Sequence, residues 1–510
     1  MQSKYQILRN FTPVATFSLL GSLMGIVVET SIAAKLGLSE SSDAFYVAFT
    51  LPYILANLIY STGQFSLVPF FSSLKTQGEE KLWGGFTYVV KVVLGGALGV
   101  ALIGAVATPH LVRLIAPGLS PAQKEQAAQW GVWLFLIVVP AGFAEVLRSF
   151  LFSQQRFAVA SAAGLFRNIT VVASIWLTFA SYGGYSIVIG YLAGYLVQVT
   201  ALSIHLFASF RVRYLPTPSG GEEAFRHLRG ATGAQLASAG TWQGLVLVER
   251  VIASFLPAGS LTALNYGFKI LSTLSELLVG SLGTAVLGSL SVAAATRSAE
   301  EEQRTFRHTL ELTLMAVAPL MVLCPMLSQE IIRFIFERGE FSREATQLMA
   351  QVFFWYSLSL ISHSFLRSLN FYFFARGESW VYYRLFLMQC SLAAGSYLIL
   401  FFLGLGVLSF PLGLLAALTL TTLTVFIRNL GGLRFTIDKN FARLGTLLLG
   451  GSLLTWLTVR LLRPHLTPPV TGFDNFVYLA ILSVAGTCVY LVTLGVGRWI
   501  RFQSRSERRG

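Results

Sequence analysis

Fourteen apolar segments, each about as long as a membrane-spanning helix, recur along the 510-residue chain. A helix needs about 20 mainly apolar residues to cross the hydrocarbon core of a bilayer. The segments cover about 11–35, 43–73, 83–107, 127–151, 158–181, 184–208, 229–256, 260–291, 308–328, 348–373, 381–403, 405–427, 441–462 and 475–497. Only 12% of the residues are charged, about half the share in a typical soluble protein. The sequence therefore predicts an all-α polytopic membrane protein with about 14 transmembrane helices.

The net charge of +14 does not indicate nucleic acid as a partner, because the distribution of the basic residues fits the predicted topology. If the N-terminus lies in the cytoplasm, most of the 37 Lys and Arg residues fall in cytoplasmic segments, as the positive-inside rule requires. The first segment has no small-residue cleavage site after it, so we expect it to remain as a helix. We predict that both termini are cytoplasmic and that the basic tail binds anionic membrane lipids.

The chain resembles itself at an offset of about 220 residues. Glu29 matches Glu249, Tyr46 matches Tyr266, and the tripeptide at 147–149 resembles that at 366–368. Because six helices separate the copies, both would enter the membrane in the same direction, as in transporters with parallel repeats. We predict an N-lobe with helices 1–6 at 1–215, a C-lobe with helices 7–12 at 225–432, and helices 13–14 with the basic tail at 433–510.

One of the predicted membrane helices carries a polar stripe. Lys269, Thr273 and Glu276 are spaced i, i+4 and i+7, so they share one helix face, with Tyr266 about one turn earlier. Charged side chains inside a membrane are costly unless they face a partner or a wet cavity. The stripe is therefore expected to face the protein interior or water.

The preceding helix carries Glu249 and Arg250 next to each other. Neighbouring positions of a helix diverge by about 100°, so the two side chains are not expected to point the same way. One hypothesis is that these charges, with Glu29, Lys269 and Glu276, only neutralise one another. The other is that Arg250 and Lys269 attract an anionic headgroup while the carboxylates gate or titrate.

No motif for catalysis occurs in the sequence. It has no phosphate-binding loop of the G-x-x-x-x-G-K-[ST] type, and its six histidines form no metal-ligand spacing. The three cysteines lie far apart in apolar surroundings and predict no disulfide or metal site. We expect a transporter without a cofactor, driven by a Na⁺ or H⁺ gradient, the membrane potential or a substrate gradient.

Several motifs, in order along residues 10–430, resemble those of the MurJ/MviN lipid II flippases, a family in the MOP exporter superfamily. The motifs are SDAFYVAFTLPYIL (Ser42–Leu55), GQFSLVPFFSSL (Gly63–Leu74), ASFLPAGSLTALNYGFKI (Ala253–Ile270), GTAVLGSLS (Gly283–Ser291), FIFERGEFS (Phe334–Ser342) and FYFFARGE (Phe371–Glu378). The resemblance implies two six-helix lobes and a further helix pair that forms a groove for a lipid tail. It also implies movement of the undecaprenyl-pyrophosphate-linked peptidoglycan precursor to the outer leaflet of a bacterial inner membrane.

The chain departs from this family at its usual cavity charges. Members usually carry three arginines on the first two helices, and the matching positions here are Ser22, Val28 and Ala56. The resemblance implies that the acids Glu29 and Asp43 are retained and that Lys269 replaces an arginine. Some members bind sodium through acids on the seventh and eleventh helices, and the eleventh segment, 381–403, contains no acid.

We predict a flippase for a polyprenyl-pyrophosphate-linked glycan, either lipid II or a related exopolysaccharide intermediate, with cell-wall synthesis proteins as candidate partners. The predicted substrate-binding residues are Glu29, Asp43, Glu249, Arg250, Tyr266, Lys269, Thr273 and Glu276. Two alternatives stay open. The related multidrug exporters suggest a drug or cation antiporter, and the missing arginines suggest a relative that no longer transports and acts as a scaffold.

Overall fold

The computed structural model describes residues 2–212, 231–280, 299–428, 439–466 and 472–506. Within these ranges every regular element is a helix and no strand occurs. The predicted all-α fold is therefore confirmed. The chain forms two compact units, Met1–Thr262 and Ala263–Gly510.

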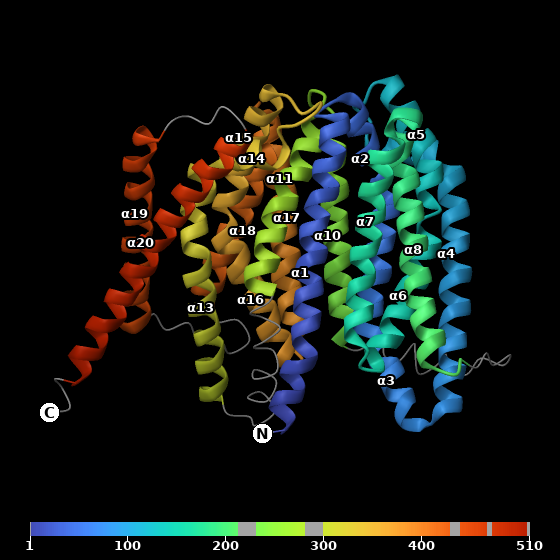
Figure 1. The fold of residues 1–510 in the computed structure, drawn as a ribbon, viewed down its shortest axis with the longest axis horizontal. Coiled ribbons are helices and arrows are strands. Elements are labelled where there is room, and N and C mark those ends of the chain that lie inside the picture. Colours follow the sequence, from blue (N-terminus) through green and yellow to red (C-terminus); the bar gives the residue numbers. More distant parts are fainter. Residues whose placement is uncertain (1, 213–230, 281–298, 429–438, 467–471, 507–510) are drawn as a thin grey trace. The chain divides into compact units, whose positions relative to one another are not determined.

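Unit 1 consists mainly of long helices that run side by side (Figure 1). Its elements are α1 (Gln2–Leu36), α2 (Glu40–Thr62), the π-helix η1 (Gly63–Leu67), α3 (Val68–Gln77), α4 (Glu79–Ile115), α5 (Pro121–Phe135), α6 (Val138–Ser153), α7 (Phe157–Tyr182), α8 (Tyr185–Ser209) and α10 (Ala231–Ala253). Helix α7 packs against both α8 and α1, and α2 packs against α5 and α6. An aromatic core in which Phe71 and Trp83 contact Phe150 joins α3, α4 and α6.

Unit 2 contains the remaining helices. They are α11 (Ser260–Ser275, whose first turn lies in unit 1), the π-helix η2 (Glu276–Gly280), α13 (Ala299–Met326), α14 (Ser328–Phe336), α15 (Arg343–Leu358), α16 (Leu360–Ala375), α17 (Ser379–Phe402), η3 (Gly406–Leu408), α18 (Ser409–Ile427), α19 (Lys439–Leu462), η4 (Arg463–His465) and α20 (Gly472–Ser506). Helices α17 and α18 pack as a pair, and so do α19 and α20. The second pair contacts α13, where Leu323, Val459 and Leu482 share one apolar cluster.

A helix lies at each of the fourteen predicted segments, and in the described residues eleven stretches are long and apolar enough to cross a membrane. The other three segments differ from these. Helix α10 is polar over much of its length (ATGAQLASAGTWQG), and the segment predicted at 260–291 is described only as far as Gly280, through α11 and η2. The segment predicted at 348–373 is broken at Ser359 into α15 and α16.

The predicted boundary between the lobes, 215–225, lies outside the described residues. The predicted lobes therefore stay a prediction, and only the two compact units are observed.

Helix α2 continues through η1 into α3 with no loop between them. A π-helical turn inserts an extra residue into a helix and is frequent at functional sites. Gly63 begins this turn, and a Cβ atom placed on it would lie 1.9 Å from Oε1 of Glu145 in α6. Glycine is therefore the residue that lets the turn pack directly against a buried carboxylate.

Candidate functional site

Asp43 lies in the first turn of α2 and is only 2% exposed. One carboxylate oxygen accepts a hydrogen bond from the backbone N–H of Gly259 at 2.7 Å. The other accepts from the backbone N–H and the hydroxyl of Thr262 at 2.9 and 2.7 Å. A helix start leaves backbone N–H groups without intrahelical partners, and a carboxylate there satisfies them. Asp43 thus caps the start of α11, and both its oxygens are engaged.

Two positions related by the offset of the sequence repeat meet at this point within unit 1. Ser42 and Thr262 are 220 positions apart, the offset of the repeat, and their hydroxyls lie 3.0 Å from each other. Gly259 has a φ of +85°, and a Cβ placed on it would lie 2.8 Å from Leu38. The close approach of the turn before α2 to the turn before α11 therefore depends on glycine at this position.

Arg250 and Glu249 are closer together than the helix geometry predicted. The Arg250 side chain is buried, with the residue 6% exposed, and its Nη1 lies 4.0 Å from Oε1 of Glu249. The same nitrogen donates to the carbonyl oxygen of Leu261 at 3.4 Å. The prediction that the two side chains diverge is corrected, because both are long enough to bend back toward each other. The headgroup role of Arg250 stays a prediction, with its guanidinium engaged inside unit 1.

Glu29 on α1 accepts a hydrogen bond from the hydroxyl of Tyr46 on α2 at 2.5 Å. The repeat-related Tyr266 does not have the same surroundings, since its ring is fully buried and stacks on Phe336 at 4.9 Å. Tyr266 therefore packs in the core of unit 2 in this structure. Tyr46 and Tyr266, which match in the repeat, thus make different contacts.

Helix α11 and η2 carry the predicted polar stripe, and α16 lies against it. Thr273 is buried, whereas Lys269 is partly exposed and Glu276 is exposed. Glu276 forms an ion pair with Arg367 of α16, and one turn earlier on α16 His363 lies 3.0 Å from the hydroxyl of Ser275. No partner for the Lys269 ammonium occurs among the residues that the structure describes. Lys269 is thus a partly exposed cation about two helical turns before the ion-paired Glu276.

Arg367 is a candidate site residue that the sequence reasoning did not select. The sequence does contain a signal for Arg367, because Arg148 and Arg367 match in the repeat. In unit 1, Arg148 binds Glu145 through two hydrogen bonds of 2.8 Å, and Ser149 donates to the same carboxylate at 3.1 Å. Both arginines thus pair with a glutamate at a π-helix. Glu145 lies on the same helix as Arg148 and contacts η1, whereas Glu276 begins η2 and Arg367 lies on α16.

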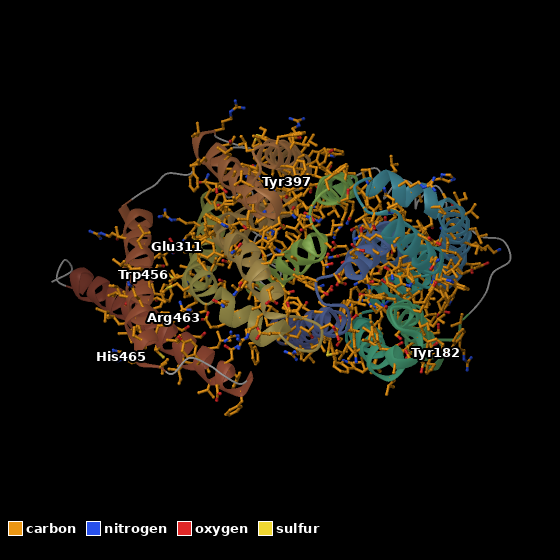
Figure 2. All side chains as sticks on the ribbon, turned by 90° about the horizontal axis from the view of Figure 1, so that it is seen from above. Tyr182, Glu311, Tyr397, Trp456, Arg463 and His465 are labelled. Atoms are coloured by element: carbon orange, nitrogen blue, oxygen red, sulfur yellow. The ribbon has the colours of Figure 1, made fainter. Side chains whose placement is uncertain are left out.

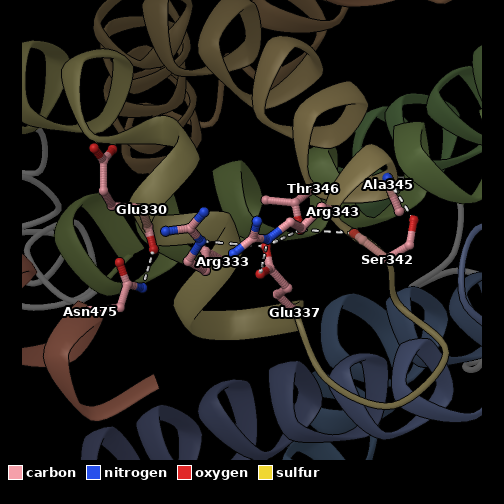
Figure 3. A network of polar contacts seen from close by, with 8 residues as sticks. All are labelled: Glu330, Arg333, Glu337, Ser342, Arg343, Ala345, Thr346 and Asn475. Carbon is pink, nitrogen blue, oxygen red and sulfur yellow. Dashed lines mark hydrogen bonds and ion pairs between the residues drawn. The ribbon is translucent and has the colours of Figure 1, made fainter. Parts of the chain in front are cut away.

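A second polar network fixes the C-terminal helix pair within unit 2 (Figure 3). The side-chain amide of Asn475, in α20, donates to the backbone oxygen of Glu330, in α14, at 2.9 Å. Arg463 of η4 pairs with the Glu330 carboxylate. Further along, Glu337 accepts from the hydroxyl of Thr346 at 2.8 Å and lies 3.5 Å from Arg333. Glu330 thus joins α14 to α20 and η4, whereas Glu337 of the FIFERGEFS motif joins the end of α14 to α15.

No group of His, Cys, Asp or Glu residues suited to a metal ion occurs in the described part of the chain. The coupling ion therefore stays an untested prediction, and the polar contacts above are the candidate functional site.

A family model for the lipid II flippase MurJ matches residues 32–468, most of the chain. The chain belongs to the lipid II flippase MurJ family. Among curated relatives, a probable lipid II flippase MurJ of Aquifex aeolicus is 25% identical over 78% of each chain. A probable lipid II flippase MurJ of Rhizobium meliloti is 29% identical over 73% of this chain and 71% of that one.

Solved structures support the same fold. A lipid II flippase MurJ in an inward closed conformation has a TM-score of 0.79 at 19% identity, covering 95% of this chain and 98% of that one. An inward-facing multidrug resistance MATE family transporter of the MOP superfamily has a TM-score of 0.67 at 14% identity, over 81% and 93%. The multidrug exporters are thus related in fold. Family membership and the eleven candidate spans identify a multi-pass protein of the bacterial inner membrane.

Proposed function

We propose that this protein is a flippase that moves a polyprenyl-pyrophosphate-linked glycan across the bacterial inner membrane by alternating access. The observation that carries the proposal is the family match over residues 32–468. The structural likeness to a lipid II flippase, which extends over nearly all of both chains, supports it. A scaffold that no longer transports would not require a partly exposed Lys269 in an apolar helix.

The charges of unit 2 fit the phosphate end of such a substrate. Lys269 is partly exposed, and Arg367 is paired with an exposed glutamate that a stronger anion can displace. A guanidinium binds phosphate with two parallel hydrogen bonds, whereas an ammonium acts as a point charge. We propose that Lys269 attracts the pyrophosphate and that Arg367 releases Glu276 and binds the pyrophosphate instead.

The glycan is either that of lipid II or that of an exopolysaccharide intermediate. The chain lacks the arginines usual at positions 22, 28 and 56, which favours a substrate distinct from lipid II, whereas the similarity to lipid II flippases favours lipid II. We also propose that both termini are cytoplasmic, that cell-wall synthesis proteins are partners, and that an ion gradient, the membrane potential or a substrate gradient drives transport.

The test is to deplete the native lipid II flippase of a bacterial host and to express this chain in its place. Restored growth supports a lipid II flippase. Failure to restore growth, together with rescue of a host that lacks an exopolysaccharide flippase, assigns the related glycan. Failure in both hosts, with normal amounts of protein in the membrane, contradicts the proposal.

A further inference from the structure

Helix α2 presents a polar aromatic face within unit 1. Tyr53 and Tyr60 are 44% and 46% exposed, and they are spaced i and i+7, so they lie on the same side of the helix. Asn57, one turn from each, is partly exposed between them, and the small side chain of Ala56 leaves space beside it. The two rings are about 10 Å apart along the helix axis.

Both rings are held in place by neighbours. The ring of Tyr53 packs against that of Phe49 with centroids 5.2 Å apart, and Phe49 contacts Tyr191 of α8 at 4.5 Å. The guanidinium of Arg148 lies 4.2 Å from the ring centre of Tyr60. Each ring is therefore supported by a neighbour while much of its surface stays open.

The chemistry of this face argues against contact with lipid. A phenol hydroxyl or an amide that faces hydrocarbon is left without hydrogen-bond partners, which is unfavourable. Arg148 also lies directly behind Tyr60, and charged groups in membrane segments usually face the protein interior or a wet space. The face carrying Tyr53, Asn57 and Tyr60 is thus suited to a hydrated, polar ligand.

The same face is poorly suited to a simple ion. Glu145 neutralises Arg148 through a two-point ion pair, so Arg148 brings little net charge with which to attract a phosphate. A cationic ligand would meet Arg148 itself, which already lies over Tyr60. Neither an isolated anion nor a cation matches this arrangement.

A sugar ring does match it. One face of a pyranose carries C–H hydrogens with partial positive charge, which complement the negative face of an aromatic ring. The hydroxyls at the edge of the sugar need donors and acceptors, which the tyrosine hydroxyls and the Asn57 amide supply. Two rings along one helix offer successive contacts to an oligosaccharide.

We propose that Tyr53 and Tyr60, on the open face of α2, stack on sugar rings of the lipid-linked substrate, with Asn57 binding their hydroxyls. This inference rests on the proposed flippase function and adds a recognition site for the glycan. Unit 1 then recognises the sugar through aromatic side chains, at a face where position 56 carries alanine.

The test measures binding of two probes to the full-length protein in nanodiscs: lipid II, and undecaprenyl pyrophosphate without sugar. We expect the wild type to bind lipid II more tightly. Tyr53→Leu and Tyr60→Leu should each weaken lipid II binding about tenfold, the scale of an aromatic contact, and leave undecaprenyl pyrophosphate binding unchanged. Tyr53→Phe and Tyr60→Phe, which keep the rings, should stay within about threefold of the wild type.

The matched control is Tyr182→Leu. Tyr182 is 60% exposed at the end of α7, on the periphery of unit 1 (Figure 2), and should not affect either probe. An exopolysaccharide lipid intermediate is measured in the same way. Sugar stacking is contradicted, while the flippase proposal stands, if the wild type prefers neither glycan lipid to undecaprenyl pyrophosphate, or if the leucine variants at 53 and 60 bind the preferred lipid like the wild type. If the wild type binds none of the three lipids, both proposals fail.

Discussion

At the scale of a residue, Asp43 stabilises the start of α11, and its predicted role in substrate binding stays a prediction. Because the buried carboxylate accepts three hydrogen bonds, Asp43→Ala should leave the Gly259 and Thr262 donors unpaired and lower the free energy of unfolding by about 1–3 kcal/mol. Thermal unfolding of the purified protein measures this. Glu40→Ala, in the same turn but exposed, is the control and should change stability little. Unfolding of Asp43→Ala at the wild-type temperature would contradict the assignment.

Lys269 and Arg250 are both positively charged, but we expect alanine substitutions at the two positions to cause different defects. Lys269→Ala should abolish growth rescue or glycan export without changing stability, because the ammonium is partly exposed and has no partner among the described residues, and Lys269→Arg should restore much of the activity. Arg250→Ala should lower stability, because it leaves the Glu249 carboxylate without its counter-ion. The exposed Lys75 provides the control, Lys75→Ala. Full activity of Lys269→Ala in a stable protein would refute the proposed role.

The π-helix η1 offers a test at the scale of an element. Gly63→Ala places a methyl group onto the Glu145 carboxylate, so either that side chain must leave its ion pair with Arg148 or η1 must shift, and the melting temperature should fall by several degrees, about 1–3 kcal/mol. Gly96→Ala in α4 is the control, because its Cβ would have no atom within 4 Å, and it should be neutral or slightly stabilising. Equal melting temperatures for the two variants would show that η1 does not pack as described.

The helices were predictable from the sequence because apolar length alone specifies a membrane span. The breaks within them were not. Nothing in the hydropathy of 43–73 marks the π-helical turn at Gly63, which is set by packing against Glu145 on a distant helix. The polar stretch of α10 and the break at Ser359 between α15 and α16 likewise do not follow from apolar length.

The candidate site was only partly predictable for a related reason. The sequence selects charges that are unusual in a membrane, and these include Lys269 and also Glu276, which the structure pairs with Arg367. It does not reveal whether a charge is already engaged, as for Asp43. Nor does the sequence show which aromatic side chains of a helix, such as Tyr53, stay exposed, because that depends on the neighbouring helices.

At the scale of the whole molecule, the two compact units carry different chemistry. Unit 1 offers the aromatic face of α2, whereas unit 2 offers Lys269 and the Arg367–Glu276 pair. This division would not be expected of an antiporter for small cations, which needs acids rather than basic residues at its site.

The most direct test of this account is transbilayer movement in proteoliposomes that contain the purified protein and a trace of lipid II, with Na⁺ and H⁺ gradients and a membrane potential imposed. The glycan exposed on the outer surface is measured over time with a membrane-impermeant sugar-binding probe, in parallel with liposomes that contain Lys269→Ala. We predict that the wild type makes inner-leaflet lipid II accessible within minutes and that the variant does not. If the wild type leaves the inner-leaflet pool inaccessible, and equally so for an exopolysaccharide lipid intermediate, the flippase assignment is contradicted.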